Sequence, residues 1–178
     1  QSSQGRSGLG YRARWARFSG HMKIVPLVVL GGYLGAGKTT LINHLLRSAQ
    51  GRRIAVLVND FGSVNIDADL IEAEADGVLA LAGGCVCCSI GADLLGALRR
   101  IVERTPCPDL VLLECSGVGI PGTVAQSAAL SAQIRVEGIV VVVDAAEFPT
   151  RLMDRFVGDT VRVQAQQADL LLLNHLDR

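Results

Sequence analysis

This 178-residue sequence has no long apolar run, little lysine and no excess of charge of either sign. No run approaches the roughly 20 apolar residues that a helix needs to cross a bilayer, so no membrane partner is expected. The 17 basic residues balance the 17 acidic ones. A net charge of zero gives no electrostatic reason to expect nucleic acid as a partner. Length and composition instead predict one packed domain with a single core.

Residues 1–21 lack an apolar period and carry four arginines without an acidic residue. An organelle presequence, a vector remnant or an over-long reading frame would each explain this composition, and Met22 has the place of a natural start. We expect 1–21 to be an extension outside the fold. We expect 22–178 to be the domain, truncated at its C-terminal end and lacking a client-binding domain.

Cysteine occurs five times, an odd number, and three of the five lie within four positions at Cys85, Cys87 and Cys88. Such crowding suits a metal or redox site better than a disulfide framework. It also implies a reducing compartment, which favours a cytoplasmic location. Cys107 and Cys115 are interpreted as structural.

Aliphatic runs punctuated by glycine predict strands that are buried on both faces. These runs are 23–30, 54–58, 110–113, 139–143 and 170–173. Helical spacing predicts helices at 38–48, 93–102 and 122–132, and one or two more within 148–167. This alternation predicts a three-layer α/β fold with a mostly parallel sheet and helices on both faces. Ligands of such sheets bind outside the carboxyl ends of the strands.

The segment Gly32–Thr39 matches the P-loop pattern G-x-x-x-x-G-K-[ST] between a predicted strand and a predicted helix. Its glycines let backbone N–H groups face the phosphates, Lys38 reaches the β- and γ-oxygens, and the Thr39 hydroxyl binds Mg²⁺. An ordinary glycine-rich turn is the alternative. The sequence thus predicts a P-loop NTPase whose loop contacts the nucleotide through Gly32, Gly35, Ala36, Gly37, Lys38, Thr39 and Thr40.

Glu114 ends a predicted strand and begins E-x-x-G, which finishes at Gly117. Gly117 can bring its N–H close to a γ-phosphate because no Cβ stands in the way. Glu114 would act on Mg²⁺ through water or orient the attacking water. With Lys38, these two residues are the predicted catalytic group. The alternative for Glu114 is a strand-end acid that caps the next turn.

Asn174-His175-Leu176-Asp177 matches N-x-x-D of the GTPase signature N-K-x-D. A carboxylate at Asp177 can accept hydrogen bonds from both guanine N1–H and N2–H₂, whereas adenine offers no such pair of donors. Asn174 and Asp177 are therefore predicted to bind the nucleotide and to select GTP over ATP. His175 stands where Lys is usual, and its ring would cover the base in place of the lysine stem.

The three clustered cysteines form C-x-C-C. In an extended segment, Cys85 and Cys87 would point to one side with Cα atoms ~6.5 Å apart, and their sulfurs could then share one tetrahedral Zn²⁺. Cys88 could join if the chain turned. Three thiolates leave one position open, which suits transfer, and soft sulfur favours Zn²⁺ or Co²⁺ over Mg²⁺. Small buried side chains or a redox pair are the alternatives.

In chain order the sequence reads GGYLGAGKTTLINHLL, VLVNDFGSVNIDADLI, GGCVCC, LLECSGVGIPGTVA, VVVVDA and QQADLLLLNHLD. It resembles the nucleotide-binding domain of the CobW-type family over Gly31–Asp177. The resemblance implies slow GTP hydrolysis in a relative of the nickel-delivery GTPases of urease and hydrogenase. It implies that this hydrolysis is coupled to delivery of Zn²⁺ or Co²⁺ from the C-x-C-C site to a client protein. A nucleotide-dependent homodimer is compatible with it.

Within the resemblance, Asn59-Asp60-Phe61-Gly62 matches a family switch segment, and Asp60 is the candidate carboxylate on the metal side. An Asx turn after a strand is the alternative for Asp60. Ser63 replaces the Glu that is common after that Gly. The family's His-rich metal tract is also missing, because the chain has three histidines in all.

Two functions of other classes remain open at this point. One is a module that senses or stores metal and binds nucleotide without significant turnover. The other is an ATP-dependent small-molecule kinase, against which the N-x-x-D and C-x-C-C motifs argue.

Overall fold

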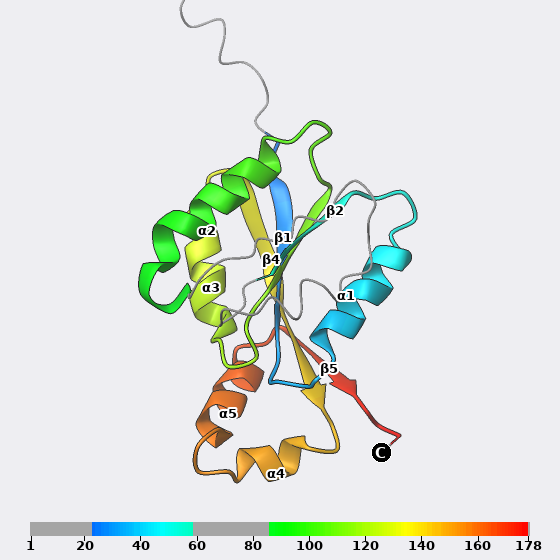
Figure 1. Cartoon of the computed structure of the whole chain (residues 1–178), viewed down its shortest axis with the longest axis vertical. Coiled ribbons are helices and arrows are strands. Elements are labelled where there is room, and N and C mark those ends of the chain that lie inside the picture. Colours follow the sequence, from blue (N-terminus) through cyan, green and yellow to red (C-terminus); the bar gives the residue numbers. More distant parts are fainter. Residues whose placement is uncertain (1–22, 59–85, 178) are drawn as a thin grey trace, which may run out of the picture.

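The computed structural model describes residues 23–58 and 86–177, with 86–93 described by their backbone alone. Its five strands form one parallel sheet in the order β2-β3-β1-β4-β5 (Figure 1). The strands are β1 (Val25–Gly31), β2 (Ile54–Val58), β3 (Leu110–Glu114), β4 (Ile134–Asp144) and β5 (Leu170–Asn174). The predicted fold class, an α/β P-loop fold with a parallel sheet between helices, is confirmed.

Five described helices alternate with the strands or follow them. They are α1 (Lys38–Arg47), α2 (Val86–Val102), α3 (Pro121–Ala128), α4 (Phe148–Leu152) and α5 (Gly158–Gln166). In Figure 1, α1 lies on one side of the sheet and α2 with α3 on the other, while α4 and α5 lie toward the end where β4 finishes. None of the described helices is long and apolar enough to cross a membrane.

Two cores separate these layers, one on each face of the sheet. Alternate residues of β1 divide between them: Leu27 and Val29 pack with Leu98 and Ile101 of α2, whereas Leu30 packs with the α1 layer. The period-2 alternation of strand side chains explains this division. Because both faces are covered, β2 is buried at all five positions, as expected for a parallel strand between helices.

The carboxyl ends of the strands finish at nearly the same level of the sheet. Glu114 of β3 is in register with Leu30 of β1 on one side and with Val58 of β2 on the other. Asp144 of β4 is in register with Asn174 of β5. The polar residues that end these strands are thereby brought to a single edge of the sheet.

Two element boundaries differ most from the sequence prediction. β4 begins at Ile134, five residues before the predicted 139–143 run, because Arg135 and Glu137 alternate with apolar residues there and interrupt the aliphatic pattern. α2 begins at Val86 instead of residue 93. The extended backbone expected for Cys85 and Cys87 is therefore wrong at Cys87, which lies with Cys88 in the first turn of α2, while Cys85 falls outside the described residues.

Candidate functional site

The loop between β1 and α1 has the conformation that a phosphate cradle requires. Gly37 has φ 101° and is the N-cap of α1, and an added Cβ there would lie 2.4 Å from Asn174 Nδ2. Glycine is therefore required at this position for both conformation and space. α1 then begins at Lys38, so its first backbone N–H groups, with the positive end of the helix dipole, face the loop.

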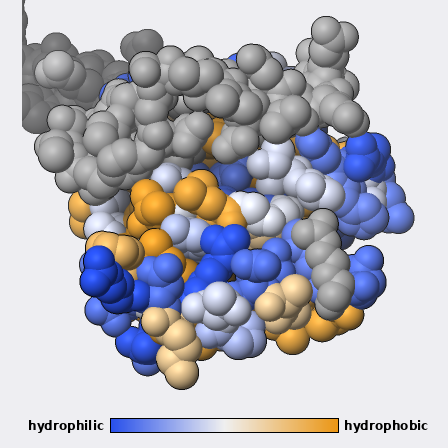
Figure 2. Space-filling model, turned by 60° about the horizontal axis from the view of Figure 1, so that its bottom comes forward, coloured by the Kyte–Doolittle hydropathy of each residue, from blue (hydrophilic) through white to orange (hydrophobic). Residues whose placement is uncertain are grey.

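A cavity of about 300 Å³ opens beside this loop at the carboxyl edge of the sheet. It brings together the P-loop, the end of β2 and the segment after β3, and its lining residues are Leu34, Gly35, Gly37, Lys38, Thr39, Thr40, Val58, Glu114, Cys115, Ser116 and Gly117. Figure 2 turns this end of the molecule toward the reader and shows hydrophobic surface beside strongly hydrophilic surface. All three predicted catalytic residues, Lys38, Glu114 and Gly117, thus line one cavity.

Opposite charges line this cavity at buried positions. Lys38 is 8% exposed and Glu114 is 3% exposed. Burial raises the pKa of the neighbouring Cys115 thiol to about 12, against the opposing effect of the Lys38 charge. Cys115 therefore stays a neutral thiol at physiological pH, which agrees with its interpretation as structural.

Thr39 and Glu114 line the same cavity and supply one hydroxyl and one carboxylate oxygen. Mg²⁺ prefers hard oxygen ligands, commonly one or two from the protein together with phosphate oxygens and water. The donor set at this place therefore fits the predicted Mg²⁺.

The segment between β3 and α3 packs directly against the P-loop. A Cβ added to Gly117 would lie 2.5 Å from Leu34 Cδ2 and 2.9 Å from the Leu34 backbone nitrogen. Gly119 N donates a hydrogen bond to Ser116 O at 2.8 Å, which closes a turn around Gly117. The E-x-x-G glycine is thus required by close approach to the phosphate-binding loop.

Asn174 contacts the P-loop itself. Its Nδ2 donates a hydrogen bond to Ala36 O at 3.0 Å, across a sequence separation of 138 residues. Gly32 and Ala36 are buried in the loop, outside the cavity lining, so their contribution is to the shape of the backbone. The predicted base-binding segment and the predicted phosphate-binding segment are therefore joined directly.

His175 has φ 56° and places its Nδ1 2.8 Å from Asp144 Oδ2. Asp144 ends β4 and also accepts hydrogen bonds from Ala146 N and Glu147 N, both at 3.1 Å. The hydrogen bond from His175 is the main reason that the pKa of Asp144 is lowered from its ordinary value. The His175 ring therefore has a fixed orientation, and the nearby Asp177 is exposed after the end of β5.

The predicted metal site lies largely beyond what the structure describes. Cys85 and Asp60 fall outside the described residues, and Cys87 and Cys88 are placed by backbone alone. Among the described side chains, no group of three or more His, Cys, Asp or Glu could hold a metal ion. β2, which leads to Asp60, does end at Val58 in the lining of the cavity.

Two polar residues at this edge were missed by the sequence reasoning. Asp144 closes the VVVVDA run, and a carboxylate directly after a buried strand was a usable signal. Gln164 of α5 is 1% exposed and lies three residues after the buried Val161. A glutamine on the buried stripe of a helix was also a signal, because a buried amide must find hydrogen-bond partners.

The family model described as "CobW/HypB/UreG, nucleotide-binding domain" matches residues 26–178. The crystal structure of hydrogenase maturation factor HypB from Archaeoglobus fulgidus is similar, with a TM-score of 0.55 and 20% identity. The similarity covers 86% of this chain and 66% of that one, and at this identity it concerns the fold alone.

Three curated relatives show closer sequence similarity. Zinc chaperone CobW of a Sinorhizobium species is 34% identical over 160 residues, which cover 85% of this chain and 44% of that protein. Zinc-regulated GTPase metalloprotein activator 1 of Schizosaccharomyces pombe is 34% identical over 86% of this chain and 39% of its own length. Zinc chaperone YjiA of Escherichia coli is 33% identical over 88% of this chain and 51% of its own length. The chain thus spans about half of these relatives or less.

Proposed function

We propose that this chain, which belongs to the CobW/HypB/UreG family of nucleotide-binding domains, binds and hydrolyses GTP and uses that cycle to deliver Zn²⁺ or Co²⁺ to a client protein. Relatives named as zinc chaperones and as a zinc-regulated GTPase support this proposal. A cytoplasmic location is part of the proposal, because clustered free thiols imply a reducing compartment.

The observation that carries the proposal is the shared cavity. Lys38 and Thr39 line it from the start of α1, while Glu114 and Gly117 line it from the end of the adjacent strand β3 and the segment that follows. A triphosphate laid along the start of α1 would meet backbone N–H groups and a buried ammonium at one side and the E-x-x-G segment at the other. Binding by the first group and hydrolysis at the second need this proximity.

Hydrolysis then follows from the residues on the two sides of the cavity. The oxygen of a water molecule bonds to the γ-phosphorus, the bond from that phosphorus to the β–γ bridging oxygen breaks, and its electron pair leaves with GDP. Glu114 orients the water and takes its proton, and Lys38 balances the charge on the β- and γ-oxygens. Bound Mg²⁺, held through Thr39 and Glu114, would neutralise further phosphate charge. Slow turnover is expected, as the family resemblance implies.

Guanine selection is assigned to the segment after β5. Asp177 would accept hydrogen bonds from guanine N1–H and N2–H₂, and Asn174 ties this segment to the P-loop through Ala36 O. The His175 ring, held at its Nδ1 by Asp144, would lie beside the base where family members use the stem of a lysine. Preference for GTP over ATP is the expected result.

The cargo site is assigned to Cys85, Cys87 and Cys88, with Asp60 as a carboxylate on the metal side. Soft thiolates suit Zn²⁺ or Co²⁺. These residues follow β2, which ends at the cavity-lining Val58, and two of them, Cys87 and Cys88, lie at the start of α2. Nucleotide state and metal affinity would therefore be coupled, and by linkage each must change the other by the same factor. A nucleotide-dependent homodimer is part of the same proposal.

Zinc titration against a chromogenic chelator, with and without a non-hydrolysable GTP analogue, tests this coupling. We expect the analogue to change the Zn²⁺ affinity of the wild-type chain and expect the C85S/C87S/C88S variant to lose the high-affinity site. C107S is the matched control, because Cys107 is a half-buried cysteine outside the cluster, just before β3. Equal Zn²⁺ affinity with and without the analogue would contradict the proposed coupling and with it the delivery cycle.

Turnover separates the proposal from a metal-storage or metal-sensing module. The wild-type chain should release phosphate from GTP in repeated cycles, and unlabelled ATP should compete poorly for labelled GTP. Binding of GTP without repeated turnover would favour the storage module. Strong competition by ATP would favour the kinase.

A further inference from the structure

Helix α5 carries a glutamine that is almost fully buried. Gln164 is 1% exposed and lies on the same stripe of the helix as Val161, which is 4% exposed. Removing an amide from water is unfavourable unless its hydrogen bonds are replaced inside the protein. The hydrogen-bond partners of the Gln164 side chain therefore indicate its role.

Both hydrogen-bond acceptors of the Gln164 amide nitrogen belong to the segment that follows Glu114. Gln164 Nε2 donates hydrogen bonds to Gly117 O at 3.1 Å and to Gly119 O at 2.8 Å. One turn further along, Gln167 Oε1 accepts a hydrogen bond from Gly122 N at 2.8 Å. Three hydrogen bonds thus hold the backbone of 117–122 against the end of α5.

The opposite side of this segment faces the P-loop. Gly117 lines the cavity and approaches Leu34 so closely that an added Cβ would lie 2.5 Å from Leu34 Cδ2. Two glycines within three residues leave the segment with little conformational restraint of its own. Its orientation must therefore come from the groups on either side, namely Leu34 and the two glutamines.

α5 is also connected to the base-binding end of the site. Asp169 follows the helix, and its Oδ2 accepts a hydrogen bond from Ile139 N at 2.8 Å while its own N–H donates to Ile139 O at 2.9 Å. β5 starts directly afterwards and leads to Asn174, which binds Ala36 O of the P-loop. The helix is thus held at its C-terminal end, and Gln164 is supported on a fixed element.

We propose that Gln164, which holds the carbonyl groups of Gly117 and Gly119, and Gln167, which holds the N–H of Gly122, are positioning residues. They keep the backbone after Glu114 in the orientation in which the Gly117 N–H faces the terminal phosphate. α5 would then distinguish the triphosphate from the diphosphate. This inference rests on the proposed function, in which Gly117 contacts the γ-phosphate. Residues that only fill the core would affect both nucleotides alike, because the diphosphate and the triphosphate use the same P-loop.

Gln164→Met tests the proposal, because methionine has nearly the same size and lacks both amide donors. Gln166→Met is the matched control, since Gln166 is exposed on the same helix. The dissociation constants for GDP and for a non-hydrolysable GTP analogue are measured, together with kcat. For Q164M we expect about 10-fold weaker analogue binding and a similar fall in kcat, from the loss of two hydrogen bonds. GDP affinity should stay within about two-fold, and Q166M should match the wild type.

Gln167→Met keeps the proposal testable if Q164M fails to fold, because it removes one acceptor at a half-buried position. For Q167M we expect about 3-fold weaker binding of the analogue and a similar fall in kcat, with GDP affinity unchanged. Equal weakening of GDP and analogue in these variants, or no change in either, overturns the inference.

Failure of the proposed function would look different. A wild-type chain that binds nucleotide without turnover, or that prefers ATP, contradicts the GTPase. The ratio of triphosphate to diphosphate affinity, measured with whichever base the wild type binds, then still tests Gln164 and Gln167. A wild-type chain that binds no nucleotide overturns both.

Discussion

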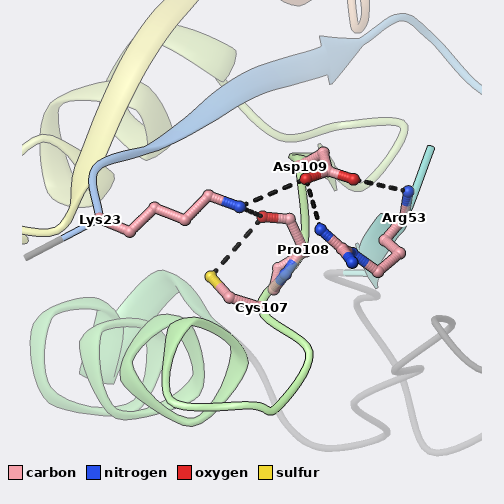
Figure 3. A network of polar contacts seen from close by, with 5 residues as sticks. All are labelled: Lys23, Arg53, Cys107, Pro108 and Asp109. Carbon is pink, nitrogen blue, oxygen red and sulfur yellow. Dashed lines mark hydrogen bonds and ion pairs between the residues drawn. The ribbon is translucent and has the colours of Figure 1, made fainter.

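The two ends of this one sheet use charged residues in opposite ways. At the amino end, Asp109 accepts hydrogen bonds from the Arg53 side chain at 2.8 Å, from Arg53 N at 3.1 Å and from Lys23 Nζ at 3.3 Å (Figure 3). Lys23 also donates to Pro108 O at 3.1 Å. These charges pair with one another at the surface, and the network joins the segments that precede β1, β2 and β3.

At the carboxyl end, the buried charges of Lys38 and Glu114 face a cavity of about 300 Å³. Glycines at close contacts shape its walls, as Gly37 does beside Asn174 and Gly117 does beside Leu34. Such an arrangement keeps backbone N–H groups and an ammonium available to an anion. The same strands thus have charges that pair with one another at the surface at one end, and buried charges that face a cavity at the other. Substitutions should therefore separate stability from nucleotide binding.

Lys38→Ala should show the largest effect. Loss of the ammonium removes charge-assisted hydrogen bonds to two phosphate oxygens, so affinity for GTP and its turnover should each fall by about 100-fold or more. Calorimetric titration and phosphate release measure these changes. Lys23→Ala, the same substitution at the amino end, should leave both within about two-fold of the wild type. A K23A effect as large as that of K38A would break the comparison.

Asp177→Asn should lower the preference for GTP over ATP by about 30-fold or more, because the amide cannot accept hydrogen bonds from both guanine donors. Competition of labelled GTP by ATP reports this ratio directly. Asp159→Asn, at an exposed carboxylate on α5, is the matched control and should keep the wild-type ratio. An unchanged ratio in D177N would mean that the base is selected elsewhere.

Gly117→Ala should reduce kcat by about 10-fold, because the new Cβ would clash with Leu34 and push the segment away from the P-loop. Single-turnover phosphate release measures it. Gly96→Ala on α2 is the matched control, since its Cβ would meet nothing closer than 3.7 Å. G96A should keep full activity and gain slightly in stability, as expected for alanine in a helix. Equal activity of G117A and the wild type would contradict the close approach.

Asp109→Asn should have the smallest effect on nucleotide binding, within about two-fold of the wild type, and should act on stability instead. Hydrogen bonds from Arg53 lower the pKa of Asp109 from 3.8 to about 2. Because the pKa of Asp109 is lower in the folded protein than in the unfolded chain, its carboxylate stabilises the fold at pH values above the ordinary pKa of 3.8. This stabilisation is lost as the pH falls through about 2. The melting temperatures of wild type and D109N should therefore converge between pH 4 and pH 2, as thermal scans would show. A gap that is constant over this range would contradict the assignment.

Much of the fold was predictable because each buried strand appears as a continuous aliphatic run. The runs 54–58 and 170–173 agree with β2 and β5 almost to the residue. Boundaries failed where the pattern was mixed, as at the start of β4, where Arg135 and Glu137 are exposed. An extended segment was expected for Cys85 and Cys87, with Cys88 joining them if the chain turned. The helical backbone at Cys87 was not foreseen because the apolar spacing predicted a helix only from residue 93.

The P-loop, the E-x-x-G turn and the N-x-x-D segment can be read from the residues alone, since each is a short pattern of residue types whose spacing carries its chemistry. Which distant segments of the chain contact these motifs follows only from the folded arrangement. Asn174 reaches Ala36, Gln164 reaches Gly117 and Gly119, and Asp144 receives His175. These contacts depend on the strand order β2-β3-β1-β4-β5 and on the side of the sheet that each helix covers. Both are set by burial of apolar faces summed over the whole chain, which no local pattern encodes.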